Sequence, residues 1–180
     1  MSTAPDTAHD AEYPVDPASL IARASAQGFW IATAESLTAG ALVARLVDAP
    51  GASAAIAGGA ACYSYEAKTR VLGVDAGLLA RTGAVTAEVA TAMAEGALRL
   101  YGADLAVSTT GVAGPGPDER GTAQGTVFLG LARRGRRTAT RELRLSGGRA
   151  EIRTRTVDAA LQLLDEALAE QQPPSSAPRR

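Results

Sequence analysis

The sequence predicts a layered α/β domain built around a mixed β-sheet. Short apolar runs that are typical of buried strands alternate along the chain with amphipathic helical patterns, which indicates helices packed on a sheet. The last two strand patterns, residues 125–133 and 139–145, are joined by an Arg- and Gly-containing turn, so this pair should form an antiparallel hairpin. Aromatic residues make up only 4% of the chain and 19 residues are glycine, which favours close packing of helices on the sheet.

Each element follows from its own pattern. The predicted helices cover residues 17–27, 39–48, 66–72, 75–81, 87–101 and 149–169. The predicted strands cover residues 29–34, 55–64, 103–110, 125–133 and 139–145. The side chains of Thr38 and Thr86 should cap two of the helices, because a threonine hydroxyl accepts hydrogen bonds from the free N–H groups there. Apolar spacing predicts buried stripes at Leu42, Val43, Leu46 and Val47, at Val89, Met93, Ala97 and Leu100, and at Ile152, Val157, Ala160, Leu161, Leu164 and Leu168.

Composition limits the classes of protein to which the chain can belong. The patterned body, residues 16–170, has the size of one domain, whereas the polar segments 1–15 and 171–180 are predicted to be disordered tails. The net charge of −1 gives no general attraction to nucleic acid or to a membrane. No apolar run reaches the ~20 residues of a membrane span, and the acidic start lacks the pattern of a signal peptide, so we expect a cytoplasmic protein.

Two rare residue types exclude several kinds of active site. His9 is the only histidine and lies in the predicted N-terminal tail, so a Ser-His-Asp triad or a His-rich zinc site within the chain is not expected. Cys62 is the only cysteine, which excludes an intrachain disulfide. A nucleophile in this chain would therefore need a base other than histidine. No cofactor is expected.

Three of the predicted strands end in chemically rich sequences. They are Ala-Glu-Ser-Leu-Thr-Ala-Gly at 34–40, Tyr-Ser-Tyr-Glu-Ala-Lys at 63–68 and Ser-Thr-Thr-Gly-Val-Ala-Gly-Pro-Gly at 108–116. Ligands of open α/β sheets bind beyond the carboxyl ends of the strands, so these segments predict the site. The third segment matches neither the dinucleotide-binding nor the Walker glycine pattern.

The first two segments suggest a nucleophile and a base. Ser36 lies between a strand end and a helix N-terminus, where free N–H groups favour an oxyanion or a phosphate, although Ser36 and Thr38 could simply cap the helix. Lys68 is the only lysine among 18 Lys and Arg residues. A neutral lysine amine can accept the serine proton whereas arginine stays charged, and Tyr63 can face the same crevice. The alternative is a solvated lysine beside Glu66 on an exposed helix.

Arginine clusters provide two further candidate sites. Arg149 and Arg153 lie one turn apart at the start of the last helix, where they could clamp a phosphate or could be an ordinary charged helix start. The arginines of residues 133–137 could contact nucleic acid, but a solvated hairpin turn is the expected interpretation and nucleic-acid binding is not predicted.

The motifs in their order resemble one family over about residues 17–168. The resemblance rests on five motifs, namely TAESLTAG at 33–40, YSYEAK at 63–68, GAVTAEVATAMAEGAL at 83–98, TGVAGPG at 110–116 and GTVFLGLA at 125–132. They are similar to the C-terminal domain of the competence/damage-inducible CinA proteins, whose stand-alone form is a nicotinamide-nucleotide amidohydrolase. The resemblance implies a three-layer α/β/α sandwich with a mixed sheet of about five strands, and it suggests a homodimer.

The resemblance also implies an activity and a set of site residues. The activity is deamidation of nicotinamide mononucleotide to nicotinate mononucleotide and ammonia in pyridine-nucleotide salvage, without a metal. The implied catalytic residues are Ser36, Tyr63 and Lys68. The N–H groups that begin the 39–48 helix are expected to steady the oxyanion. The implied substrate-binding residues are Glu35, Thr38, Gly40, Thr110, Gly111, Ala113, Gly114, Arg149 and Arg153.

The chain departs from the family pattern at three places. Leu37 and Ala39 stand where Cys and the first of two glycines are common, and Tyr65 stands where Asn is frequent. Thr122-Ala123-Gln124 replaces a common Lys-Pro-Val, which removes a cation near the expected pocket. Tyr65 and the Thr122-Ala123-Gln124 segment support an alternative function, a nucleotide-binding or regulatory CinA-like module with altered catalysis.

Overall fold

The structure is a computed structural model that describes residues 15–170. His9, the predicted tail 171–180 and nearly all of the tail 1–15 lie outside the described residues. The helices are α1 (Pro17–Ala26), α2 (Ala41–Val47), the 3-10 helix η1 (Ala52–Ala54), α3 (Tyr65–Leu72), α4 (Ala76–Thr82), α5 (Ala87–Tyr101) and α6 (Arg149–Ala169). The strands are β1 (Ile31–Glu35), β2 (Ile56–Ala61), β3 (Leu105–Gly111), β4 (Thr126–Arg133) and β5 (Ala139–Arg144).

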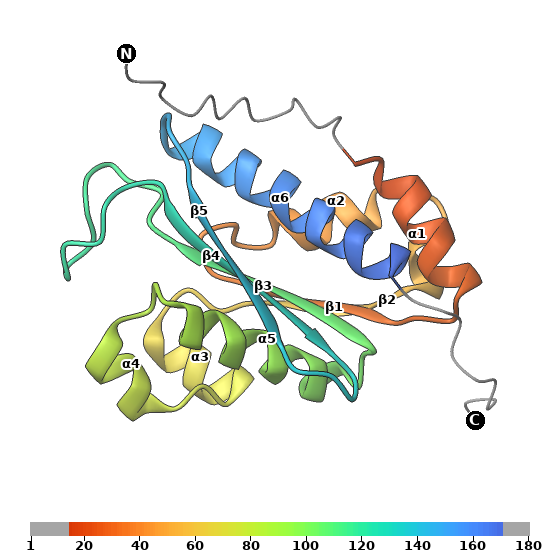
Figure 1. Ribbon diagram of the computed structural model, residues 1–180, viewed down its shortest axis with the longest axis horizontal. Coiled ribbons are helices and arrows are strands. Elements are labelled where there is room, and N and C mark those ends of the chain that lie inside the picture. Colours follow the sequence, from red (N-terminus) through yellow and green to blue (C-terminus); the bar gives the residue numbers. More distant parts are fainter. Residues whose placement is uncertain (1–14, 171–180) are drawn as a thin grey trace, which may run out of the picture.

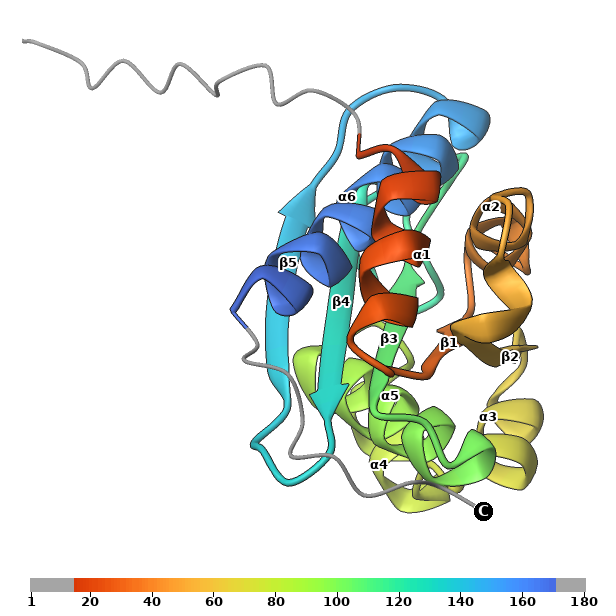
Figure 2. The same cartoon turned by 90° about the vertical axis from the view of Figure 1, so that its right-hand side faces the viewer.

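The five strands form one mixed sheet in the order β2-β1-β3-β4-β5. Strands β2, β1 and β3 are parallel, whereas β4 and β5 are antiparallel to their neighbours. The predicted hairpin is therefore present, and it converts a parallel sheet into a mixed one. Helices α1, α2 and α6 cover one face and helices α3, α4 and α5 cover the other (Figures 1 and 2). The predicted three-layer α/β/α sandwich with five strands is confirmed.

The two faces of the sheet carry side chains of different size. Ile31, Leu105 and Leu129 pack with α1, α2 and α6, whereas Ala32 and Ala106 face α5 on the opposite side. A Cβ added at Gly130 would collide with the carbonyl oxygen of Ala90 in α5. Small residues on this face therefore let α5 approach the sheet closely, as the composition predicted. Close packing of this kind fills the core without large aromatic side chains.

The beginning of α2 differs from the prediction. The Thr38 side chain does not cap a helix at residue 39, because Ala39 and Gly40 have positive φ angles of 53° and 94° and the helix begins only at Ala41. The Thr38 hydroxyl instead shares a 2.7 Å hydrogen bond with the Thr109 hydroxyl of β3. The other predicted cap is confirmed, because the Thr86 hydroxyl accepts from the N–H of Val89.

The predicted buried stripes are confirmed except at Val43, Val47 and Leu100. Val43 in α2 is only partly buried. Val47 and Leu100, which lie in the last turns of α2 and α5, are 51% and 50% exposed. All six apolar residues predicted for α6 are buried. Across residues 15–170, no helix combines the length and the apolar character that crossing a membrane requires.

Candidate functional site

The parallel strands bring the three chemically rich segments together. The carboxyl ends of β1, β2 and β3 lie at one edge of the sheet, because the three strands run in the same direction. The chain leaves β1 through α2 on one face and leaves β2 through α3, α4 and α5 on the other. Such a change of face opens a crevice beside the central strand.

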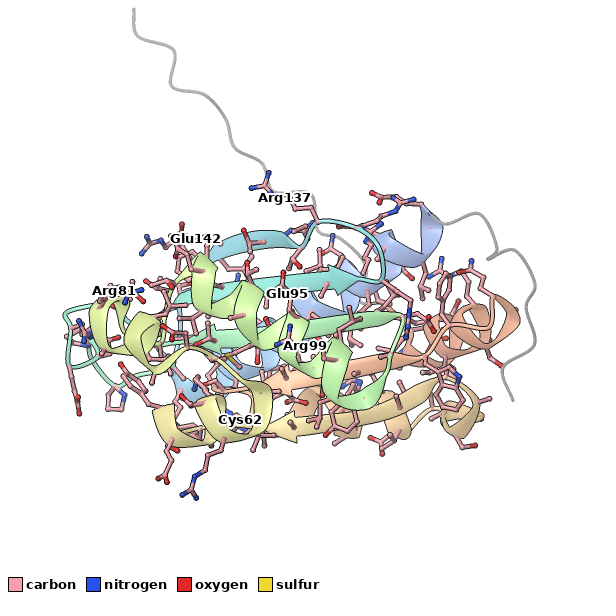
Figure 3. All side chains as sticks on the ribbon, turned by 90° about the horizontal axis from the view of Figure 1, so that it is seen from below. Cys62, Arg81, Glu95, Arg99, Arg137 and Glu142 are labelled. Atoms are coloured by element: carbon pink, nitrogen blue, oxygen red, sulfur yellow. The ribbon has the colours of Figure 1, made fainter. Side chains whose placement is uncertain are left out.

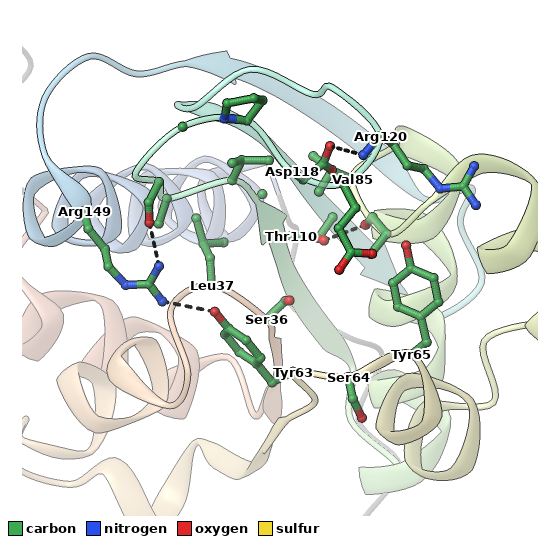
Figure 4. A pocket seen from close by; sticks show the side chains of 18 of the residues that line it. Ser36, Leu37, Tyr63, Ser64, Tyr65, Val85, Thr110, Asp118, Arg120 and Arg149 are labelled. Carbon is green, nitrogen blue, oxygen red and sulfur yellow. Dashed lines mark hydrogen bonds between the residues drawn. The ribbon is translucent and has the colours of Figure 1, made fainter.

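A cavity of about 650 Å³ occupies this crevice. It is lined by Ser36, Leu37, Tyr63, Ser64, Tyr65, Lys68, Ala84, Val85, Arg149 and residues 110–120 (Figure 4). Eight of the predicted site residues are among them, namely Ser36, Tyr63, Lys68, Thr110, Gly111, Ala113, Gly114 and Arg149. Four predicted site residues do not line the cavity, namely Glu35, Thr38, Gly40 and Arg153.

Lys68 and Ser36 are in direct contact. The Nζ atom of Lys68 lies 3.0 Å from Oγ of Ser36, 2.8 Å from the carbonyl oxygen of Cys62 and 3.1 Å from that of Tyr63. Helix α3, which the Ser64 hydroxyl caps at its N-terminus, carries Lys68 on its inner side. The solvated-lysine alternative is therefore wrong, because the Lys68 side chain has 0% exposure.

The surroundings of Lys68 shift its amine toward the neutral form. Burial lowers the pKa of Lys68 from 10.5 to about 8, and the nearby Cys62 thiol opposes this shift by a smaller amount. A neutral amine has two N–H donors and one lone pair. The carbonyls of Cys62 and Tyr63 can accept the two donors, which leaves the lone pair for the hydroxyl proton of Ser36. The geometry is that of a serine with an amine base.

The hydroxyl of Tyr63 lies on the arginine side of the cavity. Nη2 of Arg149 donates to this hydroxyl at 3.0 Å, and Nη1 of Arg149 donates to the carbonyl oxygen of Gly114 at 2.8 Å (Figure 4). Lys68 contacts Tyr63 through the backbone carbonyl, not through the phenol. The amine of Lys68, rather than the phenol of Tyr63, is therefore the group in hydrogen-bond contact with Ser36.

The N-terminus of α2 is occupied by a protein carboxylate. The carboxylate of Glu35 accepts hydrogen bonds from the N–H groups of Gly40, Leu42 and Val43 at 2.8 to 3.0 Å. Glu35 is 1% exposed, and the Thr33 hydroxyl donates to it as well. The expectation that these N–H groups hold an oxyanion is therefore wrong, because they already bind an anion that the sequence places one residue before Ser36.

The residues that follow Ser36 are held from α6. Nε of Arg153 donates to the carbonyl oxygen of Leu37, and Nη2 of Arg153 donates to that of Thr38, each at 2.9 Å. Arg153 therefore binds the backbone that follows Ser36, whereas Arg149, one turn earlier, lines the cavity.

Sequence reasoning missed the role of Gln124. Its side-chain oxygen accepts from the N–H of Gly116 at 2.9 Å, and its amide nitrogen donates to the carbonyl oxygen of Gly147 at 3.0 Å. The side chain packs so closely on Gly114 that a Cβ there would collide with it. The only signal in the sequence was the departure of residues 122–124 from the family pattern.

The arginines of the hairpin have mainly structural contacts. Arg133 forms an ion pair with Glu170, and Arg134 donates to the carbonyl oxygens of Gly102 and Ala103 at the end of α5. Arg137 by contrast points away from the body of the molecule (Figure 3). Within residues 15–170, no group of three or more His, Cys, Asp and Glu side chains is arranged to hold a metal ion.

A sequence model of the CinA C-terminal domain matches residues 17–168. The chain belongs to the CinA family. The match extends from the first residue of α1 to the penultimate residue of α6, so every strand and helix of the sandwich falls within the CinA domain. The family resemblance based on the ordered motifs is confirmed.

Curated relatives support the same assignment. The chain is 53% identical over 138 residues to a CinA-like protein of Mycolicibacterium vanbaalenii, and 48% identical over 139 residues to a CinA-like protein of Mycobacterium tuberculosis. Each match covers 77% of this chain, but 33% of the first relative and 32% of the second. The chain thus spans about a third of the length of these CinA-like relatives.

Solved CinA structures share the fold. A CinA superfamily protein of Klebsiella pneumoniae superposes with a TM-score of 0.83 at 35% identity, covering 89% of this chain and 100% of the other. A competence/damage-inducible protein of Agrobacterium tumefaciens gives a TM-score of 0.79 at 36% identity, covering 89% and 99% of the two chains. The α/β/α sandwich is therefore the CinA superfamily fold.

Proposed function

We propose that this CinA-family chain hydrolyses the carboxamide of nicotinamide mononucleotide to nicotinate mononucleotide and ammonia, with Ser36 as nucleophile and Lys68 as general base. The observation that carries the proposal is the 3.0 Å contact between a buried amine and a serine hydroxyl inside a cavity. Burial lowers the pKa of Lys68 to about 8, so a useful fraction of the amine is neutral near neutral pH.

The first half of the reaction forms an ester with the enzyme. The lone pair of Lys68 Nζ takes the hydroxyl proton of Ser36 while Oγ attacks the carboxamide carbon. The electrons of the C=O bond move to oxygen and give a tetrahedral intermediate. When the intermediate collapses, the C–N bond breaks and the protonated Lys68 donates its proton to the leaving nitrogen, which departs as ammonia.

The second half restores the enzyme by the same proton path. Water gives a proton to the neutral Lys68 and attacks the ester carbon, and the new intermediate then expels Ser36 Oγ. Lys68 returns the proton to Oγ, so the product leaves as a carboxylic acid that ionises in water. In both halves of the reaction, Lys68 first accepts a proton as a base and then donates it as an acid. The reaction therefore requires no histidine.

The oxyanion needs donors other than those that Glu35 occupies. The Ser36–Ala39 turn is closed by a hydrogen bond from the N–H of Ala39 to the carbonyl oxygen of Ser36. Among residues 15–170, the N–H groups of Leu37 and Thr38 within this turn have no acceptor. We propose that one or both of them bind the oxyanion, since the N–H group after a nucleophilic serine often has this role.

The shape and charge of the cavity suit a nucleotide monophosphate. Its volume of about 650 Å³ falls in the usual range for small-molecule sites. Arg149 lines it together with the glycine-rich segment Gly111–Gly116, and its planar guanidinium can bind a phosphate. The carboxamide would then lie at Ser36 and the phosphate near Arg149.

Ammonia release from nicotinamide mononucleotide by the purified chain tests the proposal. We expect turnover by the unchanged chain and a loss of at least about 10³-fold for Ser36→Ala, with binding retained in calorimetry because the variant removes one oxygen atom. Thr91→Ala in α5 is a matched hydroxyl control that should keep full activity. Release of ammonia at the same rate by Ser36→Ala would rule out this nucleophile.

The same assay separates the amidohydrolase from a binding module. Tyr65 lines the cavity at a position where the family motif favours Asn, which is the observation that favours altered catalysis. Calorimetric binding of nicotinamide mononucleotide without any ammonia release would support the nucleotide-binding module. The absence of both binding and release would reject this substrate.

A further inference from the structure

Arg153 contacts the backbone that directly follows the nucleophile. Its Nε and Nη2 atoms donate to the carbonyl oxygens of Leu37 and Thr38, both at 2.9 Å. These bonds join residues more than a hundred positions apart, so they link α6 to the end of β1. Because the two acceptors belong to adjacent residues, the planar guanidinium binds two neighbouring peptide groups.

The two residues that follow Thr38 have an unusual backbone conformation. Ala39 has a φ of 53°, which non-glycine residues rarely adopt, and Gly40 follows with a φ of 94°. Glu35 holds the far side of this segment through three N–H groups of Gly40, Leu42 and Val43. The turn after Ser36 is therefore held from two sides. The Glu35 carboxylate binds N–H groups at its end, and the Arg153 guanidinium binds the carbonyl oxygens at its beginning. Strained backbone of this kind persists only where the surroundings fix it.

Arg153 is separate from the cavity that Arg149 lines. Arg149 directs its guanidinium to Tyr63 and Gly114 at the cavity wall, whereas Arg153 is half-buried and does not line the cavity. Within residues 15–170, no carboxylate forms an ion pair with Arg153. Its charge is therefore directed at the two carbonyls behind Ser36.

We propose that Arg153 is a positioning residue for the Ser36 nucleophile and not a phosphate ligand. By fixing the peptide groups of Leu37 and Thr38, it holds Ser36 Oγ against Lys68 Nζ. This inference rests on the proposed amidohydrolase function for its kinetic test, and on the Ser36–Lys68 contact alone for its second test. Lysine cannot replace Arg153, because one ammonium cannot span two adjacent carbonyls with the same planar fork.

The kinetic test compares two substrates that differ only in the phosphate. We expect Arg153→Lys and Arg153→Gln to lower kcat about 10- to 100-fold on both nicotinamide mononucleotide and nicotinamide riboside, with KM changed less than about threefold. Arg149→Gln should instead raise KM for the mononucleotide and have little effect on the riboside. Arg155→Lys, on the same helix, is the matched control and should match the unchanged chain.

A second test reads the nucleophile without the substrate. The rate at which a fluorophosphonate probe labels Ser36, located by mass spectrometry, should fall in both Arg153 variants by a factor similar to that in kcat. Arg155→Lys should label at the rate of the unchanged chain. Melting temperatures establish that the variants compared are folded.

The outcomes separate this inference from the proposed function. A loss confined to the mononucleotide and to KM would make Arg153 a phosphate ligand, and unchanged labelling in both variants would likewise overturn the positioning role. If the unchanged chain releases no ammonia but labels at Ser36, the proposed substrate is wrong and the labelling rates still decide the role of Arg153. A chain that neither turns over nor labels would overturn both proposals.

Discussion

Nζ of Lys68 lies 3.0 Å from Oγ of Ser36, although the two residues are 32 positions apart in the sequence. The amine is fully buried, and its other two hydrogen bonds go to backbone carbonyls. Within residues 15–170, no carboxylate forms an ion pair with it. Desolvation without a counter-charge lowers the pKa of Lys68 to about 8. The sole lysine thus occupies a place where a permanently charged arginine could not act as a base.

Replacing Lys68 should abolish most of the activity whatever the replacement. We expect Lys68→Arg and Lys68→Ala each to lower kcat for ammonia release by about 10²–10⁴-fold, because neither side chain can accept the serine proton. Tyr63→Phe is the informative comparison and should cost less than about tenfold in kcat, since the phenol contacts Arg149 and not Lys68. Full turnover by Lys68→Arg would show that another group is the base.

The pH dependence of the reaction should report the titration of Lys68. The neutral amine is the active form, so kcat/KM should rise about tenfold per pH unit at low pH and level off above an apparent pKa of about 8. Burial lowers this pKa from 10.5, so a rise that continued to pH 10.5 would contradict the assignment. Stopped assays of ammonia release across this range supply the measurement.

Burial of Lys68 should also make stability depend on pH. The lowered pKa means that the unfolded chain binds more protons than the folded chain between about pH 8 and 10.5, so the contribution of Lys68 to stability increases as pH rises through this window. Relative to Lys68→Met, the unchanged chain should gain about 3 kcal/mol of unfolding free energy over that window, at 1.36 kcal/mol per pKa unit. Denaturant unfolding of both chains at matched pH values measures the gain. If the unfolding free energies of the two chains changed in parallel with pH, a strongly lowered pKa of Lys68 would be excluded.

Ala39 should limit stability through its backbone. Its φ of 53° lies in the left-handed region, which costs a residue with a Cβ roughly 1–2 kcal/mol, so Ala39→Gly should raise the free energy of unfolding by about 1 kcal/mol after the entropy of the unfolded chain is counted. Ala44→Gly, at an exposed position within α2, is the matched control and should lower it by about 1 kcal/mol. Equal effects of the two changes would argue against strain at Ala39.

Gln124 should matter for binding more than for chemistry. Its side chain links Gly116 to Gly147, two residues before Arg149. Gln124→Val removes both hydrogen bonds and should raise KM for nicotinamide mononucleotide about three- to tenfold with a small change in kcat. Gln124→Glu keeps the acceptor for the Gly116 N–H but loses the donor to Gly147, so an intermediate KM is expected. A change in kcat alone would place Gln124 in the catalytic step instead.

The sequence by itself determined the order and type of the elements. Helix and strand patterns, the hairpin and the buried stripe of α6 depend on local periodicity, which a single chain displays directly. The same is true of the candidate nucleophile and base, since a lone lysine, a serine at a strand end and the lack of a usable histidine are facts of composition. The ordered motifs also placed the chain in the CinA family before any geometry was known.

Only the tertiary structure decided which of these groups meet. The contacts of Ser36 with Lys68, and of Arg153 with Leu37 and Thr38, join segments far apart in the chain. Local patterns carry no information on such pairings, because parallel strand order and the packing of α6 set them. The contact of Glu35 with the α2 N-terminus could not be predicted for a different reason. It depends on the left-handed backbone at Ala39 and Gly40, which brings the N–H groups at the start of α2 to the Glu35 carboxylate.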